Sequence, residues 1–368
     1  MTSDLSTWIT EQRLNGLLLR GLGAAAPADV VSRLTAMQAQ EHPHARWSVA
    51  LRMAGEPRAS AIDEAFDQGQ FLRTHVLRPT WHYVAASDLR WLIRLSGPRV
   101  DAANARMRAS LGLDDRTLGQ SNYVIAEAVA GAPRTRPELA AMLDDRGLAP
   151  GGLRGTYMVM YAELTAVICS GPMRGKQHTY AAFEQRVPVR PGPEGDEALA
   201  ELAWRYFSTR GPATLRDFSW WSGISAADTR RALEMVRPRL VSVQDGGRGY
   251  WFAEQSLAPS PGSRIDLVQC YDELIISYNQ TRDVLNGPLA AFKVPGDIDG
   301  FRHVLLMDGR LLGHWRVRAV RGRPEVETRT AARLNGGQQG ELTRAVDSYR
   351  RFAEPESSGV PHGENRPP

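Results

Sequence analysis

The first 115 residues alternate between helical and strand-like patterns of apolar positions. Apolar residues recur at helical spacing over Ala28–Gln40 and again over Ser60–Gln68, so both segments are predicted to be helices. Phe71–Val84 is instead rich in Thr, Val, Trp and Tyr around an Arg-Pro pair, which predicts a β-hairpin. A long amphipathic helix is expected over Ala86–Leu111, broken or kinked at Gly97-Pro98.

Residues 116–192 repeat this order of helices followed by strands. A helix is predicted over Tyr123–Ala130. The next helix opens at Thr135, because a threonine cap, a proline in the first turn and Glu138 three residues later form a capping box. Arg154–Cys169 is predicted to be the following helix, and Gly175–Arg186 to hold a wing-like strand.

Residues 193–260 give the clearest version of the same unit. Glu197–Thr209 and Thr214–Trp221 are predicted helices, and Ser225 caps a third helix that runs to Val236. A strand, a glycine-rich turn and a second strand follow over residues 240–252. A helix-turn-helix followed by a hairpin is the winged-helix arrangement, which the two earlier units are predicted to share.

Residues 261–352 turn to strands and then to a last helix. His303–Met307 and Leu311–Val317 flank an Asp-Gly pair, which predicts a hairpin within a small sheet or barrel. A helix is expected over Gly340–Phe352, and the Pro-, Gly- and Glu-rich tail, 353–368, is predicted to be disordered.

The chain is therefore predicted to be a mostly helical α+β protein. Its expected parts are three tandem winged-helix units, over residues 1–115, 116–192 and 193–260, and a C-terminal β-rich subdomain over 261–352.

Composition narrows the class of protein. A chain of 368 residues with 42% hydrophobic residues can bury a large core. No apolar run approaches the ~20 residues of a membrane helix, and no secretion signal opens the chain, so a cytoplasmic protein is expected.

Cys169 and Cys270 are the only cysteines and lack metal-ligand spacing, which predicts two reduced thiols. The 45 basic residues are arginine except Lys176 and Lys293, and the net charge is only +4, so a nucleic-acid surface requires arginines gathered on one face.

The tripeptide Gln38-Ala39-Gln40 is the first candidate for chemistry. A glutamine amide is no general base at neutral pH, but its carbonyl oxygen accepts a hydrogen bond from water and turns a dipole towards developing positive charge. Two such amides suit hydrolysis of a bond whose leaving group is already cationic. On a regular helix the two side chains point about 200° apart, so they share a target only if the helix ends or distorts there, which Pro43 favours. The alternative is a polar helix end with two solvated amides.

Three ordered blocks of sequence resemble a family of bacterial winged-helix DNA glycosylases. The blocks are Ala36–Glu41 with Ala45–Trp47, Leu72–His82, and Gly211–Thr214 with Asp217–Gly223, and the resemblance extends over roughly residues 10–335. The family includes an azinomycin-resistance glycosylase of antibiotic-producing actinobacteria, and a sister branch carries a carboxylate in place of the second glutamine. The resemblance implies that Gln38 and Gln40 are catalytic. The predicted fold then becomes a concave clamp around duplex DNA.

The expected activity is that of a monofunctional DNA glycosylase acting on bulky N7-alkylguanine adducts, with interstrand crosslinks as a further substrate class. Alkylation at N7 makes the base cationic, so its departure needs no general acid. No lysine lies near the glutamines in sequence to form the Schiff base of strand cleavage. No cofactor is expected. Self-protection in a producer of a DNA-alkylating compound is the role that the resemblance allows.

Two other classes of function remain open at this point. The first is a non-catalytic winged-helix DNA-binding protein such as a regulator, and the second is sequestration of a toxin or lesion without turnover. Three units in one chain, which predict a monomer on double-stranded DNA, disfavour a regulator, because regulators usually reach two half-sites by dimerising.

Five further side chains are candidates for DNA contact. Arg78, His75 and His82 lie in the predicted hairpin of the first unit, where the resemblance favours phosphate or lesion contact and the alternative is ordinary strand polarity. Arg248 follows the glycines of the third unit's hairpin, and Arg310 follows the Asp-Gly turn; each suits a minor-groove contact as well as it suits a solvated arginine. A metal site built from the two histidines is not expected, because no cysteine or carboxylate cluster accompanies them.

Overall fold

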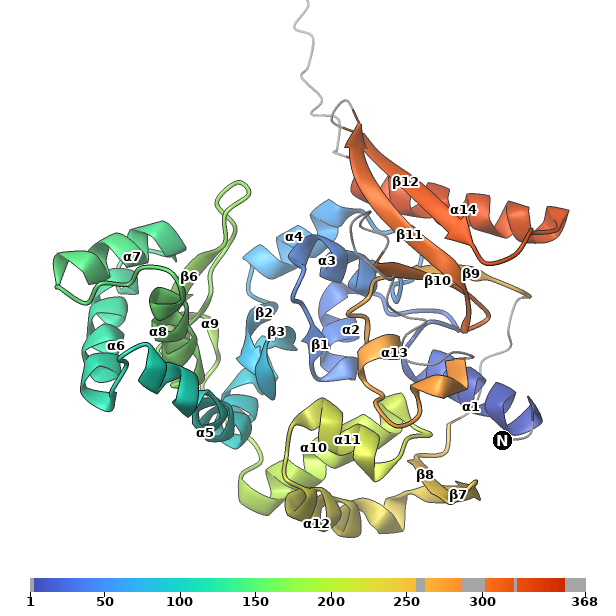
Figure 1. Cartoon of the computed structure of the whole chain (residues 1–368), viewed down its shortest axis with the longest axis horizontal. Coiled ribbons are helices and arrows are strands. Elements are labelled where there is room, and N and C mark those ends of the chain that lie inside the picture. The colour runs from blue at the N-terminus through green and yellow to red at the C-terminus, as the bar shows by residue number, and fades with distance from the viewer. Residues whose placement is uncertain (1–2, 256–261, 286–301, 321–322, 355–368) are drawn as a thin grey trace, which may run out of the picture.

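The computed structural model describes residues 3–255, 262–285, 302–320 and 323–354, and Figure 1 shows how its elements are arranged. Helices and strands are mixed and helix predominates, as expected. Among these residues no helix is long and apolar enough to cross a membrane. Disorder is expected over 353–368. Of these residues the structure describes Ala353 and Glu354, and 355–368 lie outside the described residues.

The first unit has the order helix, strand, two helices, two strands. After α1 (Ser3–Gly16), its elements are α2 (Pro27–Leu34), β1 (Met37–Gln38), α3 (His42–Ala50), α4 (Ala59–Asp67), β2 (Phe71–Val76) and β3 (Arg78–Ala85). β1 pairs antiparallel with β3, and β3 with β2, so the sheet order is β1-β3-β2. The hairpin turns at Leu77, whose φ is 62°, one residue before the Arg-Pro pair.

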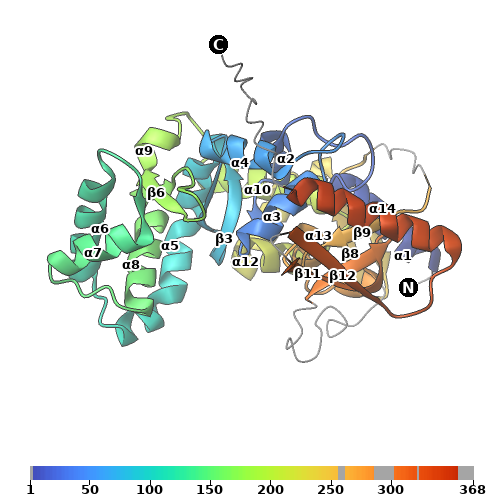
Figure 2. The same cartoon turned by 90° about the horizontal axis from the view of Figure 1, so that it is seen from above.

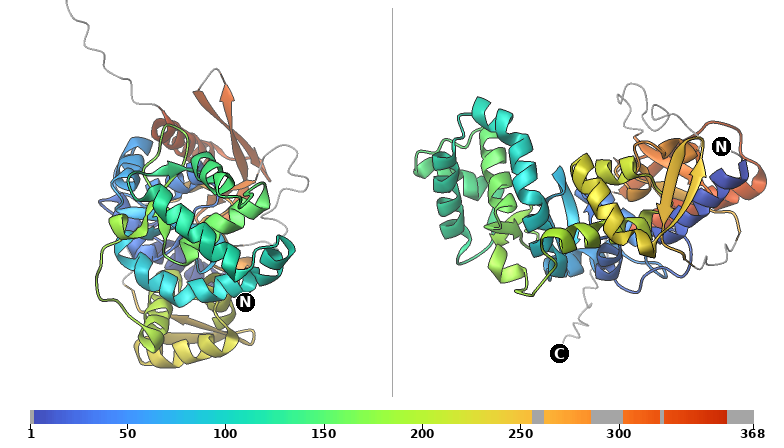
Figure 3. Two further views of the ribbon diagram at one scale, coloured as in Figure 1. Left: turned by 90° about the vertical axis from the view of Figure 1, so that its left-hand side faces the viewer. Right: turned by 90° about the horizontal axis from the view of Figure 1, so that it is seen from below.

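The second unit repeats this order at one end of the molecule (Figures 2 and 3). α5 (Ala86–Ser110) leads from the first unit into it. Its elements are α6 (Asp115–Val129), β4 (Arg134–Thr135), α7 (Arg136–Asp145), α8 (Leu153–Leu164), β5 (Ile168–Ser170), β6 (Thr179–Ala182) and α9 (Phe183–Arg186). The sheet order β4-β6-β5 matches that of the first unit, and the predicted capping box of Thr135 and Glu138 is present.

The third unit has the same order with a reduced sheet. Its elements are α10 (Gly195–Arg210), α11 (Leu215–Ser222), α12 (Ala226–Val236), η1 (Arg237–Arg239), β7 (Val241–Asp245) and β8 (Arg248–Phe252). A single bridge between Ala213 and Trp251 stands where the other two units have their first strand. α11 starts at a capping box of Thr214 and Asp217 and ends at Gly223 with φ 67°, a conformation that favours glycine.

The C-terminal part is an open antiparallel sheet rather than a barrel. Its elements are β9 (Ile265–Val268), α13 (Glu273–Ile276), η2 (Arg282–Leu285), β10 (His303–Met307), β11 (Arg310–Val320), β12 (Arg323–Thr330) and α14 (Gly336–Ala353). The strand order is β12-β11-β10-β9, and β10 turns into β11 at the predicted Asp308-Gly309 pair. α14 packs against β9 and β12 (Figure 1).

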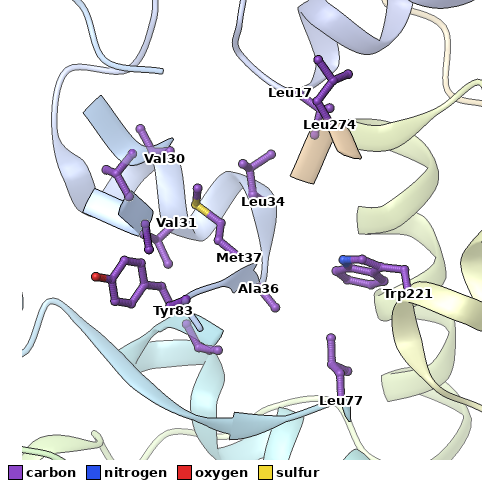
Figure 4. Packing of buried hydrophobic residues seen from close by; sticks show 14 of the residues in the cluster. Leu17, Val30, Val31, Leu34, Ala36, Met37, Leu77, Tyr83, Trp221 and Leu274 are labelled. Atoms are coloured by element: carbon purple, nitrogen blue, oxygen red, sulfur yellow. The ribbon is translucent and has the colours of Figure 1, made fainter. Parts of the chain in front are cut away.

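Two large hydrophobic cores and two smaller clusters support this architecture in the described residues. The largest core joins the first unit, the third unit and the C-terminal sheet, and the second largest fills the second unit. Figure 4 shows the first core around β1: Val31 and Met37 pack towards Tyr83 of β3, while Trp221 of α11 lies across from Ala36. The segment that carries the two glutamines is therefore anchored by apolar contacts on both sides.

Several expected helix boundaries are wrong. The helix expected over 28–40 ends at Leu34, because Thr35 adopts a φ of 65°, and the chain continues as a strand. The helix expected over 154–169 ends at Leu164, and β5 follows. α5 is one helix through Pro98, since its packing against α8 and the first sheet compensates for one lost hydrogen bond. α3 escapes sequence prediction because nearly all of its sides are buried, which removes the helical periodicity.

Candidate active site

The glutamine motif, Gln38-Ala39-Gln40, lies on an extended segment at the edge of the first sheet. Gln38 pairs with His82 of β3, and the N–H of Ala39 donates to the carbonyl of Trp81 at 2.7 Å. β1 ends at Gln38, and Gln40 follows at a bend two residues later. Both glutamines therefore lie outside α2, and the helical geometry that would point their amides apart does not apply to them.

Gln38 is held at both its main chain and its side chain. Its N–H donates to Glu273 Oε1 at 2.8 Å, and its own Oε1 accepts from Arg78 Nη2 at 2.9 Å. A guanidinium only donates hydrogen bonds, so this contact fixes which end of the amide is the oxygen. The side chain is buried, and its dipole is thus set before any substrate arrives.

Gln40 differs from Gln38 in having a free acceptor. Its Oε1 is buried, and no group in the described part of the chain donates to it. Arg73 fixes the neighbouring main chain instead, with Nε 2.9 Å from the Ala39 oxygen and Nη2 3.4 Å from the Gln40 oxygen. A buried carbonyl oxygen without a donor is costly, so Gln40 Oε1 is the acceptor that a water or a substrate can use.

Of the three hairpin candidates, Arg78 is the one whose side chain donates a hydrogen bond to the motif. His75 is enclosed, with Nδ1 2.5 Å from Glu163 Oε2 of α8, and both side chains are buried. His82 is fully buried with Nδ1 2.9 Å from the Thr80 oxygen, and burial lowers the pKa of its imidazole well below the usual value. The fold thus encloses both histidines rather than presenting them to a phosphate.

Comparisons with known proteins bear directly on this site. The model of the family described as "DNA glycosylase AlkZ-like" matches residues 31–352. The chain belongs to the AlkZ-like DNA glycosylase family. A curated relative, the "Interstrand DNA cross-link repair glycosylase" of Streptomyces sahachiroi, is 26% identical over 304 residues, which are 79% of this chain and 82% of the relative. The solved Streptomyces sahachiroi DNA glycosylase AlkZ shares the fold, with a TM-score of 0.76, 20% identity, and coverage of 96% of this chain and 99% of that one.

Membership of the AlkZ-like family settles the class of function. The resemblance found in the sequence is confirmed, and the chain is an enzyme of the class that hydrolyses N-glycosyl bonds. The assignment therefore decides against the non-catalytic DNA-binding protein and against sequestration without turnover.

The two arginines expected to reach DNA from hairpin turns are both engaged within this AlkZ-like enzyme. Arg248 forms an ion pair with Asp283 at 3.0 Å, and a hydrogen bond with Tyr250, followed by the contact with Asp283, raises the pKa of the guanidinium. Arg310 donates from Nη2 to Thr7 Oγ1 of α1 at 2.7 Å. Each guanidinium is partly exposed and has five N–H groups, so a phosphate contact can add to the protein contact.

One group of side chains in the glycosylase has the donor types of a metal site. Ligand atoms of Glu41, His44 and His303 lie within 4.8 Å of one another. Arg302 Nη1 already lies 2.9 Å from Glu41 Oε1, and the N–H of Cys270 donates to His303 Nδ1 at 3.3 Å. The Glu41 carboxylate is already paired with an arginine, and one ring nitrogen of His303 already accepts a hydrogen bond. The group therefore fits a hydrogen-bonded network better than a metal centre.

Three residues around the motif were not anticipated from the sequence. Arg73 lies inside a block that resembles the family and faces the motif across β3, so strand pairing offered a signal for it. No signal in the sequence pointed to Glu273 or Arg210. Glu273 lies 235 residues from Gln38 in the chain, and only the folded structure brings the two together.

Proposed function

We propose that this glycosylase hydrolyses the N-glycosidic bond of bulky, cationic N7-alkylguanine adducts and does not cleave the strand. The observation that carries the proposal is the pair of amides: Gln38, fixed by Arg78, and Gln40, whose buried Oε1 has no donor. Amides at neutral pH supply hydrogen-bond acceptors and dipoles but no acid. An N7-alkylated guanine departs as a neutral base, so the site has what this leaving group needs.

The proposed reaction transfers one water. Its oxygen bonds to C1′ of the sugar while the bond between C1′ and N9 breaks, and the released electron pair neutralises the cationic base. Gln40 Oε1 accepts a hydrogen bond from the water, and Gln38 contributes a fixed dipole beside the positive charge that develops on the sugar. The displaced proton of the water passes to solvent.

The ionisable neighbours of the motif support a mechanism without a general acid. A hydrogen bond from His44 lowers the pKa of Glu41, which keeps this carboxylate ionised near neutral pH. Burial lowers the pKa of His42 to about 2, and its Nδ1 lies 2.6 Å from the Tyr83 hydroxyl. Neither group carries an acidic proton at neutral pH, so neither favours excision of a base that must be protonated to leave.

We further propose that the protein acts as a monomeric clamp on double-stranded DNA. The parts would be winged-helix units over 1–115, 116–192 and 193–260 and the β-rich subdomain over 261–352. The repeated element order and the matching sheet orders β1-β3-β2 and β4-β6-β5 support the proposal. In this arrangement Arg78 contacts the damaged nucleotide, because it adjoins Gln38. Arg248 and Arg310, both partly exposed, are assigned to the DNA backbone.

The relative's name supports a further substrate class. The curated relative from Streptomyces sahachiroi is named for interstrand crosslink repair. We therefore include N7-linked interstrand crosslinks among the substrates, since each linked base is a cationic N7-alkylguanine. Self-resistance to a DNA-alkylating natural product is the proposed physiological role.

The decisive experiment compares matched duplexes that carry one lesion each, followed by heating in alkali and detection of strand scission at the lesion. We expect excision of N7-alkylguanine, and none of uracil or 8-oxoguanine over equal times, because those bases leave as anions unless protonated. Omitting the alkali step should leave the strand intact, which tests the absence of strand cleavage. Comparable release of uracil would refute the amide mechanism.

A further inference from the structure

We propose that Glu273 is a positioning residue of the glutamine motif, an inference that rests on the proposed catalytic role of Gln38 and Gln40. Its carboxylate, 1% exposed, accepts the N–H of Gln38 at Oε1 over 2.8 Å. β1 is an edge strand, and this N–H belongs to a sheet edge that no further strand covers in the first unit. Glu273 therefore occupies the place of a missing strand beside the first glutamine.

The other oxygen of Glu273 accepts hydrogen bonds from three side chains: Arg210 of α10, Trp221 of α11, and Ser277, which follows α13. Oε2 accepts from Arg210 Nη2 at 2.7 Å, from Trp221 Nε1 at 2.9 Å and from Ser277 Oγ at 2.8 Å. Charge-assisted hydrogen bonds of this kind are short and strong, and the set leaves the carboxylate one orientation. The main chain of Gln38 is thus held in place by α10, α11 and α13 as well as by its own sheet.

Arg210 extends this anchor to the residues before the motif. Its Nη2 donates to the carbonyl oxygens of Leu34 and Ala36, each at 2.9 Å. These are the groups that flank Thr35, where the helix gives way to the strand. Arg210 and Glu273 together hold residues 34–38 at both ends of that change of direction, and so fix where the glutamine motif begins.

Placement of this kind matters more to rate than to binding. Misplacement of a catalytic group by about 1 Å can cost 10²-fold in rate, while the contacts to phosphates that hold the DNA are unaffected. A glutamine at 273 keeps the size of the side chain but has one oxygen and one amide group. It cannot accept from both Gln38 and Arg210, so one of the two contacts is lost.

The test compares Glu273→Gln with a matched control, Asp266→Asn. Asp266 is equally buried at 1% exposed, but its arginine partners, Arg20 and Arg264, lie outside the motif. We expect Glu273→Gln to lower the single-turnover rate of excision about 10- to 100-fold, with DNA affinity within about twofold. Asp266→Asn should leave the rate within about threefold at a similar loss of thermal stability.

Amide hydrogen exchange at Gln38 supplies a readout independent of activity. Exchange of this N–H should rise at least about tenfold in Glu273→Gln and stay unchanged in Asp266→Asn, because only the first variant touches it. Trp221→Phe, which removes one donor to Glu273 Oε2 and keeps the aromatic ring, is a milder second variant, expected to lower the rate about 3- to 10-fold.

Faster exchange with a wild-type rate would make Glu273 purely structural and overturn the proposal, as would unchanged exchange at Gln38. The rate is measured on whichever lesion of the panel above the wild-type enzyme excises. A wild-type enzyme that ignores N7-alkylguanine but excises another base therefore refutes the proposed substrate while leaving the positioning role open to the same measurements.

Discussion

The two glutamines of the motif have unequal surroundings. Gln38 is fixed by Arg78 at its oxygen and by Glu273 at its main chain, whereas Gln40 has a buried oxygen that no described side chain satisfies. A group with a free acceptor can take part directly in the reaction, and a group that is already bound contributes mainly its fixed dipole. The two residues should therefore differ in what their removal costs.

We expect Gln40→Ala to lower the excision rate by about 10²–10³-fold, the usual loss for one aimed dipole, and Gln38→Ala to lower it less. DNA affinity should stay within a few-fold for both. Single-turnover excision from an N7-alkylguanine duplex measures the effect, and Gln68→Ala, an exposed glutamine at the end of α4, serves as the control. Wild-type rates in both motif variants would remove the catalytic assignment, and a larger loss in Gln38→Ala would reverse the division of roles.

At this scale the sequence could show which residues to examine but not how they are arranged. Gln38 and Gln40 are predicted from amide chemistry and from a resemblance, and Arg78 from the resemblance; the structure joins Gln38 and Arg78 by a hydrogen bond. His75 and His82 are expected near DNA, yet both are buried: α8 packs on β2, which carries His75, and α2 packs on β3, which carries His82. Alternation along a strand does not reveal which helix covers it. Whether a strand residue is buried depends on the element that packs against the strand, and the sequence of the strand does not show it.

Among the helices, two capping boxes offer a direct comparison of a local and a tertiary role. Thr135 caps α7 within the second core. Asp217 is the third helical residue in the capping box of α11, where its Oδ2 accepts the N–H of Thr214, and its Oδ1 also accepts the N–H groups of Asn279, Gln280 and Thr281 at 2.9, 2.7 and 3.2 Å. The second carboxylate thus ties a helix of the third unit to a segment of the C-terminal part.

We expect Thr135→Ala to lower the free energy of unfolding by about 1 kcal/mol, the usual value of a cap. Asp217→Ala should lower it by about 3 kcal/mol, because it also leaves buried N–H groups without an acceptor. Urea unfolding measures both changes. Because the two residues belong to separate cores, each variant should shift the transition of its own core if the cores unfold separately. Equal losses in the two variants would show that the ties to residues 279–281 contribute nothing.

Element boundaries were predictable where a cap marks them and not where the backbone turns on its own. The starts of α7, α11 and α12 follow from Thr135, Thr214 and Ser225. The end of α2 does not follow from any residue type, because Thr35 is a non-glycine residue with a positive φ that tertiary contacts enforce. That single unpredicted turn is what converts a helical motif into an extended one.

For the whole molecule, binding to DNA should be electrostatic and nearly independent of sequence. A net charge of +4 with arginine as the main cation leaves phosphate contacts as the general source of affinity. We expect affinity for undamaged duplex to fall linearly on a log–log plot against salt, by about 10³-fold between 50 and 200 mM if at least six phosphates are contacted. Selection from a random duplex pool should return no consensus. Recovery of a sharp palindrome would point to site-specific recognition instead.

The distance along the chain between Gln38 and Glu273 has a consequence for how this enzyme comes into being. Contacts between residues 235 positions apart are entropically expensive to close and form late in folding. During synthesis the first unit leaves the ribosome long before residue 273 is made. The nascent chain therefore carries both glutamines for most of its synthesis without the carboxylate beside them. If Glu273 positions the motif as proposed, a truncated product that lacks residue 273 would hold both glutamines but not their geometry.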